Sequence, residues 1–122
     1  MNYRTHYITL KNLLLHQAGL FPFIKFYELL INPKGGFVDD LVVSIPDSKH
    51  HKMITPSKYL LDSWIDTIQS RILKSPITTA GKYVYSDNDF IFLGQIVEQV
   101  SGMSLNDYAT QSFYRPLGMI ST

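Results

Sequence analysis

Apolar residues recur at helical spacing in five segments of the chain, and proline, glycine or polar residues separate these segments. The spacing predicts helices over residues 10–16, 23–31, 56–75, 87–102 and 104–113. A short extended run is predicted over residues 82–85, between a turn at Gly81 and the fourth helix. The pattern therefore predicts a mainly α fold with little strand.

Residues that start or stop helices support several of these boundaries. Thr9 can cap the first helix, and Asp87 is expected to cap the fourth helix, which ends at Gly102. Pro56 suits the first position of the third helix, and Ser104 resembles the first residue of a capping box. The predicted buried stripes consist of Tyr59, Leu60, Trp64, Ile65, Ile68 and Ile72 in the third helix, and of Phe90, Ile91, Leu93, Ile96, Val97 and Val100 in the fourth.

Residues 34–55 follow a different pattern. They contain a glycine pair, a β-branched patch and the polar run Ser48 to Lys52, without helical periodicity. This composition predicts a long loop or an insertion.

Composition and charge exclude several classes of function. The chain has 122 residues, the length of one domain, and 45% of them are hydrophobic, which predicts a globular protein. Its net charge of +1 comes from scattered basic residues, so no nucleic-acid or anionic-membrane partner is predicted. The apolar runs are far shorter than the roughly 20 residues of a membrane span, and no secretory signal is visible. Zero cysteines exclude disulfides and thiolate chemistry.

Histidines and acids do not form a recognisable metal site. His50 and His51 are adjacent, so their side chains diverge, and no H-E-x-x-H pair is present. The run Asp87-Asn88-Asp89 lacks the spacing and the glycine of a calcium loop. We interpret these acids as solvated turn residues and a helix cap, and we expect no metal.

Tyr85-Ser86-Asp87 stands where chemistry is favoured, directly before a predicted helix. Unpaired N–H groups and the positive end of the helix dipole favour a polarised or anionic phenol there. Tyr85 is therefore a candidate general base. The structural alternative is a packed tyrosine ring, a turn serine and a helix cap, which is the commoner arrangement.

Three stretches in order resemble motifs of the serine β-lactamase and penicillin-binding protein superfamily, in its class C, esterase and D-aminopeptidase-like branch. Residues 8–20 are similar to I-T-x-x-x-L-L-x-H-x-S-G-L. Residues 85–102 are similar to Y-S-N followed by a phenylalanine, L-G and a helix that ends in S-G, and residues 113–122 to P-L-G-M-x-x-T. The match spans residues 8–122, and residues 34–55 have no counterpart. It implies a helical subdomain of a β-lactamase-like α/β fold, with most of the sheet missing.

The resemblance also implies roles for individual residues. The family's tyrosine takes part in proton transfer beside a nucleophilic serine, so Tyr85 would be the general base. Asp87 occupies the position of an asparagine that orients the substrate and a lysine, and Ser86 would contribute to substrate binding. An acid at position 87 adds negative charge that opposes phenolate formation. His16 and Gly19 match positions that shape the scaffold. No cofactor is implied.

The nucleophile of such an enzyme is not found in this sequence. The family carries it in an S-x-x-K motif, and no serine of the chain is followed three residues later by lysine. The family places S-x-x-K before the stretch at residues 8–20, and a K-T-G or H-x-G element after residues 113–122. We therefore expect residues 1–122 to be an internal fragment, inactive alone, of a serine hydrolase that forms an acyl-enzyme with a β-lactam, a peptide or an ester.

Two other interpretations remain open. The chain can be a non-catalytic helical module, descended from such an enzyme, that binds a ligand or a protein beside Tyr85. Alternatively, the motif match is accidental. As a subdomain it is expected to expose apolar surface near Phe21, Phe23 and Tyr85, and to self-associate through it. The resemblance further implies a parent enzyme that is exported to the periplasm and acts on small molecules or peptides.

Overall fold

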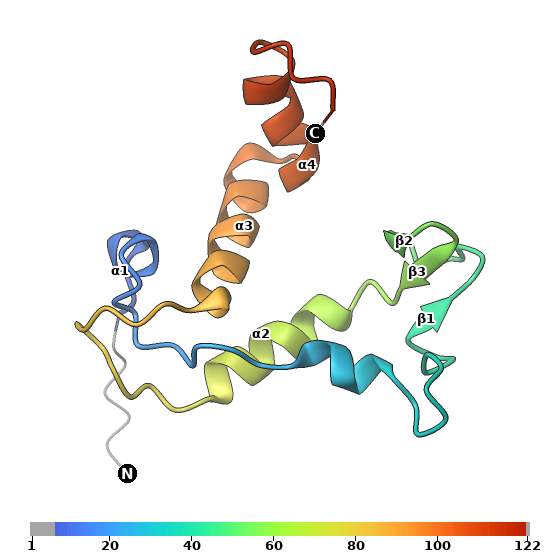
Figure 1. Ribbon diagram of the computed structural model, residues 1–122, viewed down its shortest axis with the longest axis horizontal. Helices are drawn as coiled ribbons and strands as arrows, with labels where there is room; N and C mark the ends of the chain where they lie inside the picture. Colours follow the sequence, from blue (N-terminus) through green and yellow to red (C-terminus); the bar gives the residue numbers. More distant parts are fainter. Residues whose placement is uncertain (1–6, 122) are drawn as a thin grey trace. The chain divides into compact units, whose positions relative to one another are not determined.

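The structure, a computed structural model, describes residues 7–121. Its helices and strands, drawn in Figure 1, are α1 (Leu10–Leu14), the 3₁₀ helix η1 (Phe26–Leu30), β1 (Val42–Val43), β2 (Lys52–Thr55), β3 (Lys58–Leu60), α2 (Trp64–Lys74), α3 (Asp87–Ser101), α4 (Leu105–Ala109) and the π-helix η2 (Thr110–Tyr114). The chain divides into two compact units, which are described in turn: Met1–Pro22 with Ile77–Thr122, and Phe23–Pro76.

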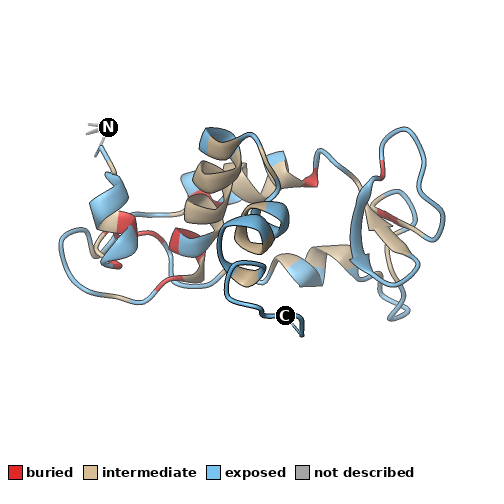
Figure 2. Cartoon of the chain, turned by 90° about the horizontal axis from the view of Figure 1, so that it is seen from above, coloured by how far each residue is buried: buried red, intermediate tan, exposed pale blue. Residues whose placement is uncertain are grey.

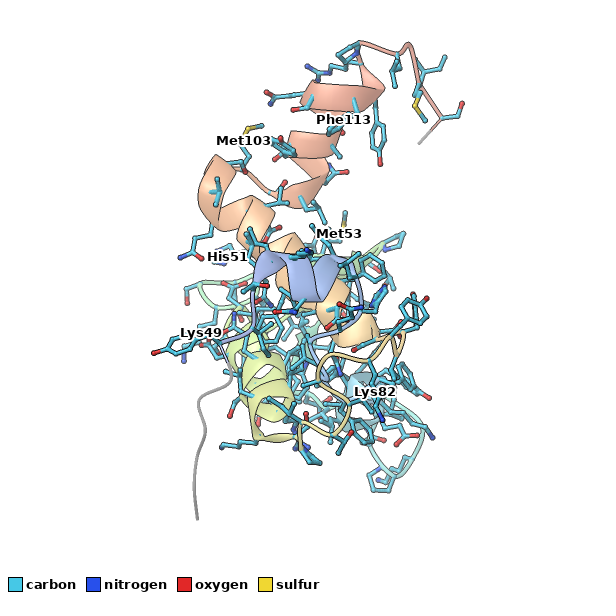
Figure 3. The ribbon with its side chains drawn as sticks, turned by 90° about the vertical axis from the view of Figure 1, so that its left-hand side faces the viewer. Lys49, His51, Met53, Lys82, Met103 and Phe113 are labelled. Atoms are coloured by element: carbon cyan, nitrogen blue, oxygen red, sulfur yellow. The ribbon has the colours of Figure 1, made fainter. Side chains whose placement is uncertain are left out.

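The unit formed by Phe23–Pro76 contains a small antiparallel sheet with the strand order β1-β3-β2. In β3, Leu60 pairs with Val42 of β1 on one side and with Lys52 of β2 on the other. His51 and Met53, labelled in Figure 3, stand at the start of β2 and within it. Two strands, β1 and β2, therefore lie within residues 34–55, for which the sequence predicts a long loop or an insertion.

The helix predicted from Pro56 begins eight positions later, at Trp64 in α2. Pro56 and Ser57 instead form the turn between β2 and β3, in which Ser57 has a positive φ of 63°. Residues 58–60, which were predicted to be helical, therefore form β3 and pair with the neighbouring strands. The second half of the prediction holds, because Trp64 and Ile72 are buried and the helix ends at Ser75, whose hydroxyl donates to the carbonyl of Ile72.

The helix predicted over residues 23–31 is present only as the shorter η1. No side chain caps its first turn, and its i,i+3 ion pair between Lys25 and Glu28 is exposed to solvent. Short 3₁₀ helices often serve as connectors, and their hydrogen-bond geometry is poorer than that of an α-helix.

In the other unit, α1 begins as its cap signal predicts. Thr9 accepts a hydrogen bond from the backbone N–H of Asn12, and the Asn12 side chain accepts one from the Thr9 N–H, which completes a capping box. The helix ends at Leu15, and His16 follows with a left-handed φ of 52°. Gly19, at φ 76°, passes close to the backbone of Ala80.

The last helices also begin and end near their predicted residues. Gly102 ends α3 in the left-handed conformation, with φ 68°. Ser104 caps α4 by accepting a hydrogen bond from the N–H of Asp107. The helical course continues through η2, where Figure 3 labels Phe113. Within residues 7–121 the α-helices therefore outweigh the one small sheet, as expected for part of a β-lactamase-like fold.

Burial along α3 differs from the prediction. Its apolar stripe is only partly buried: Phe90 is 52% exposed and Val100 is 82% exposed, whereas the other four residues, Ile91, Leu93, Ile96 and Val97, are half-buried. The buried residues lie instead in the polar first turn, together with the end of α1 and the loop that follows it (Figure 2); they are Leu13, His16, Ala18, Leu20, Ser86, Asn88 and Asp89. The short helices α1 and α4, of five residues each, pack against α3.

Candidate active site

The candidate site lies where an irregular extended segment, residues 83–86, enters α3 (Figure 1). Two backbone hydrogen bonds fix this entry to the loop after α1. The N–H of Val84 donates to the carbonyl of His16 at 2.9 Å, and the N–H of Asp87 donates to the carbonyl of Pro22, also at 2.9 Å. Tyr85 lies between these two anchors, so its backbone is held while its side chain stands on the surface.

Tyr85 is 54% exposed, and one side of its ring is packed. The ring centroid lies 4.7 Å from that of His16, with the planes tilted by 43°, and 6.0 Å from that of Phe90. The residue therefore precedes a helix N-terminus, as predicted, with a supported ring and access to solvent. A tyrosine in this environment can exchange a proton with a bound molecule.

Ser86 is buried, and its hydroxyl is already engaged. The hydroxyl donates to the carbonyl of Phe21 at 3.1 Å, and the side-chain amide of Asn88 donates to the same carbonyl. Ser86 occupies the N-cap position of α3, although its side chain makes no cap hydrogen bond. The predicted role of Ser86 in substrate binding stays a prediction.

Asp87 does not cap α3, so that part of the sequence prediction is wrong. It is the first helical residue, and Ser86 precedes it in the extended conformation. The extended backbone at Ser86 moves the helix start by one residue. Asp87 and Asp89 both lie in the first turn, where negative charge interacts favourably with the helix dipole.

His16 and Asp89 form a buried pair at the base of the site. The Nδ1 atom of His16 lies 2.8 Å from Oδ2 of Asp89, and the backbone N–H of Ser86 donates to the same Nδ1 at 3.3 Å. The imidazole also meets the rings of Tyr83 and Phe90 edge-on. The loop after α1 and the first turn of α3 are thus joined by side chains as well as by backbone.

Asp89 is not the solvated turn acid that its sequence context predicts. Its side chain is 1% exposed, and burial raises the pKa of its carboxyl group above the ordinary value, while the hydrogen bond between Asp89 and His16 works in the opposite direction. The Oδ1 atoms of Asp89 and Asn88 are buried and have no hydrogen-bond partner among the described residues. Sequence reasoning missed this pair, because nothing local marks two residues 73 positions apart as neighbours.

Ser86, His16 and Asp89 have the residue types of a catalytic triad but not its geometry. A nucleophilic serine needs its hydroxyl on the imidazole, whereas here the backbone N–H of Ser86 contacts His16 and the hydroxyl contacts Phe21. The site therefore brings together an exposed tyrosine, Tyr85, which is the candidate proton-transfer group, and a buried pair that packs against its ring through His16.

Metal-binding clusters and membrane-spanning helices are two further features that would bear on function within residues 7–121. No group of three or more histidine, aspartate or glutamate side chains in this range is placed to hold a metal ion. In the same part of the chain, no helix has the length and apolar character needed to cross a membrane.

Comparisons with known proteins agree with the motifs. A sequence model of the Beta-lactamase family matches residues 2–122. An Escherichia coli (strain K12) protein named "Putative D-alanyl-D-alanine carboxypeptidase" is 51% identical over 41 residues, which is 34% of this chain and 9% of that protein. A protein of the same name from Salmonella schwarzengrund is 38% identical over 58 residues, 46% of this chain and 13% of that protein.

The matched segments thus span only about a tenth of the length of these curated relatives. No solved structure matches the chain.

Proposed function

The chain belongs to the Beta-lactamase family, and from that membership we propose that it is the helical part of a serine hydrolase that forms an acyl-enzyme with a β-lactam, a peptide or an ester. Tyr85 is the residue that serves this reaction, as the general base that moves the proton during acylation and deacylation. The observation that carries the proposal is the half-exposed Tyr85 ring, held before the N-terminus of α3 between two backbone anchors.

Asp87 and Ser86 take supporting roles in the proposal. Asp87 begins α3 beside Tyr85 and stands where the family motif has an asparagine, so we assign it to orientation of the substrate. Its negative charge disfavours a phenolate nearby, which predicts a different substrate preference or a slower reaction than an asparagine would give. Ser86 is buried and its hydroxyl donates to the carbonyl of Phe21, so we assign its part in substrate binding to holding the start of α3 in place.

The chain supplies the proton-transfer group without the nucleophile, because it contains no S-x-x-K. Removing the nucleophile of a serine hydrolase leaves at most the weak catalysis of the remaining site. Residues 1–122 alone are therefore inactive in this proposal, and the active protein carries S-x-x-K on a segment outside them. The name of the relatives suggests peptides ending in D-alanyl-D-alanine as the first substrate class to test.

The test begins with the reading frame on both sides of the gene segment. The proposal requires S-x-x-K upstream in frame and K-T-G or H-x-G downstream. In the protein so defined, Tyr85→Phe should lower the rate of acylation by a fluorescent penicillin about 10²- to 10⁴-fold, the range of a lost general base. Tyr83→Phe, which removes a hydroxyl from the neighbouring exposed ring, is the matched control and should leave the rate unchanged.

A second candidate function is a non-catalytic module that binds a ligand or protein beside Tyr85. The exposed apolar side chains around the site, Phe21, Tyr85 and Phe90, favour it. A reading frame that begins at Met1 and stops at Thr122 would support the module. Acylation that is equal in the Tyr85→Phe variant and the parent would remove Tyr85 from the mechanism.

A further inference from the structure

The support beneath Tyr85 is the buried pair formed by His16 and Asp89. The Tyr85 ring packs on the imidazole at 4.7 Å between centroids, and Nδ1 on the same imidazole is held by Asp89 at 2.8 Å. Asp89 belongs to the first turn of α3, and His16 to the loop after α1. Asp89 is therefore linked to the orientation of the Tyr85 ring through the imidazole of His16.

The hydrogen bonds around Nδ1 indicate where the proton of the pair resides. The backbone N–H of Ser86 points at Nδ1 and can donate only if that nitrogen carries a lone pair. With a lone pair on Nδ1, the donor in the 2.8 Å contact between Nδ1 and Oδ2 is Asp89, as a carboxylic acid, and the Ser86 N–H at 3.3 Å is a weaker second donor to the same lone pair. The unpartnered Oδ1 of Asp89 agrees with this assignment, because a neutral carbonyl oxygen costs less to bury unpaired than a carboxylate oxygen.

We propose that His16 and Asp89 are an uncharged positioning pair for Tyr85, in which the Asp89 acid donates to Nδ1 of a neutral His16 and the imidazole face fixes the phenol ring. The effect of the pair on the reaction rate rests on the proposed function. The protonation of the pair and its contact with the Tyr85 ring follow from the geometry alone.

An uncharged pair suits a general base better than an ionised one. A buried carboxylate close to the Tyr85 ring would add a second negative charge to that of Asp87 and oppose phenolate formation. With the proton on Asp89, the pair holds the Tyr85 ring in place and adds no negative charge beside it. Position matters to the rate, because a shift of about 1 Å in a reacting group can cost about 10²-fold.

The first experiment reads the protonation of the pair directly in the 122-residue chain. Nitrogen-15 NMR of histidine-labelled protein near pH 6 reports which ring nitrogen of His16 carries hydrogen, and carbon-13 NMR reports the protonation of the Asp89 carboxyl. We expect an unprotonated Nδ1 and a protonated Asp89. A proton on Nδ1 together with an ionised Asp89 overturns the uncharged pair, and this measurement needs no variant.

Variants then test positioning, with the Tyr85 ring resonances and their cross-peaks to His16 and Phe90 as the readout. His16→Asn removes the imidazole face while tolerating the positive φ of this position, so the ring should lose its fixed orientation. Asp89→Ala should release the ring as well. Asp89→Asn, whose amide can still donate to Nδ1, should restore it.

The control is His51→Asn, the same change in an exposed histidine that is paired with Asp62 in the other unit. It should leave the Tyr85 resonances unchanged. Unaltered Tyr85 resonances in both His16→Asn and Asp89→Ala would overturn the positioning role.

Acylation separates this inference from the proposed function. In the protein that carries S-x-x-K, His16→Asn and Asp89→Ala should slow acylation by a fluorescent penicillin about 10²-fold through kcat, with KM retained, and Asp89→Asn should keep most of the rate. If Tyr85→Phe abolishes acylation but His16→Asn does not slow it, the inference fails and the function stands. If the unsubstituted protein is not acylated, the function fails and the NMR result still decides the pair.

Discussion

Backbone conformation at single residues decides how closely the loop after α1 can approach the segment before α3. Gly19 has φ 76°, and a Cβ atom there would lie 2.5 Å from the backbone nitrogen of Ala80. Gly81 has a similar φ of 81°, but a Cβ atom there would meet nothing within 4 Å. Both positions favour glycine because their φ angles are positive. Only at position 19 would a side chain also clash with a neighbouring backbone.

These two glycines give a matched pair of substitutions. Gly81→Ala should lower the free energy of unfolding by about 1–2 kcal/mol, the cost of a left-handed conformation with a side chain. Gly19→Ala should cost about 1–3 kcal/mol more, because the added methyl group forces the backbone at Ala80 to move. Urea denaturation of both variants checks the difference, and equal losses would show that the close contact does not constrain this loop.

At the scale of the element, α4 illustrates how a five-residue helix depends on its first residue. The hydroxyl of Ser104 accepts a hydrogen bond from the N–H of Asp107 at 3.1 Å and donates to its carboxylate at 2.8 Å. No residue of α4 is buried, so packing contributes little to its stability.

Ser104→Ala should therefore destabilise the fold by about 1 kcal/mol, the usual value of a lost N-cap. Ser104→Thr keeps a hydroxyl and should retain most of the stability. Ser112→Ala, at an exposed position of η2, is the control and should change the free energy of unfolding by less than about 0.5 kcal/mol. Chemical denaturation followed by circular dichroism measures all three, and a loss in Ser112→Ala as large as in Ser104→Ala would contradict the capping role.

Over the whole molecule, exposed apolar surface is the feature with the largest consequence. Phe21, Phe23 and Tyr85 are 43%, 49% and 54% exposed, so the expectation of exposed apolar side chains is confirmed at these residues. An apolar groove of about 480 Å³ also lies within the unit that contains α1 and α3. It is lined by Leu10, Leu14, Leu93, Ile96, Val97, Val100, Ser101 and Tyr108. Apolar patches of this kind favour association with another surface.

We expect the chain to self-associate through this groove. Val100→Lys places a charge at its most exposed wall and should weaken association about tenfold or more, since burying a valine contributes about 1.5–3 kcal/mol. Ile120→Lys is the control, because Ile120 is 96% exposed and does not line the groove. Sedimentation velocity over a concentration series checks this, and a monomer at every concentration, or equal effects of both variants, would rule the groove out.

The sequence predicted the parts of the fold that local chemistry decides. Thr9 and Ser104 were identifiable as caps, and Gly102 as the end of α3, because capping and left-handed termini depend on residues within one turn of each other. The position of Tyr85 before a helix followed from the same signals. Pro56 misled the prediction, since proline suits a turn as well as a first helical turn, and pairing of β3 with two strands decided between them.

By itself, then, the sequence determined the family, the order of α1, α3 and α4, and Tyr85 as the candidate proton-transfer group. Only the tertiary structure decided what lies beneath Tyr85. His16 and Asp89 are 73 residues apart, and their pairing and burial depend on the loop after α1 folding back onto the first turn of α3. Desolvation, which raises the pKa of Asp89, is a property of that packed environment and not of the residues next to it in the chain.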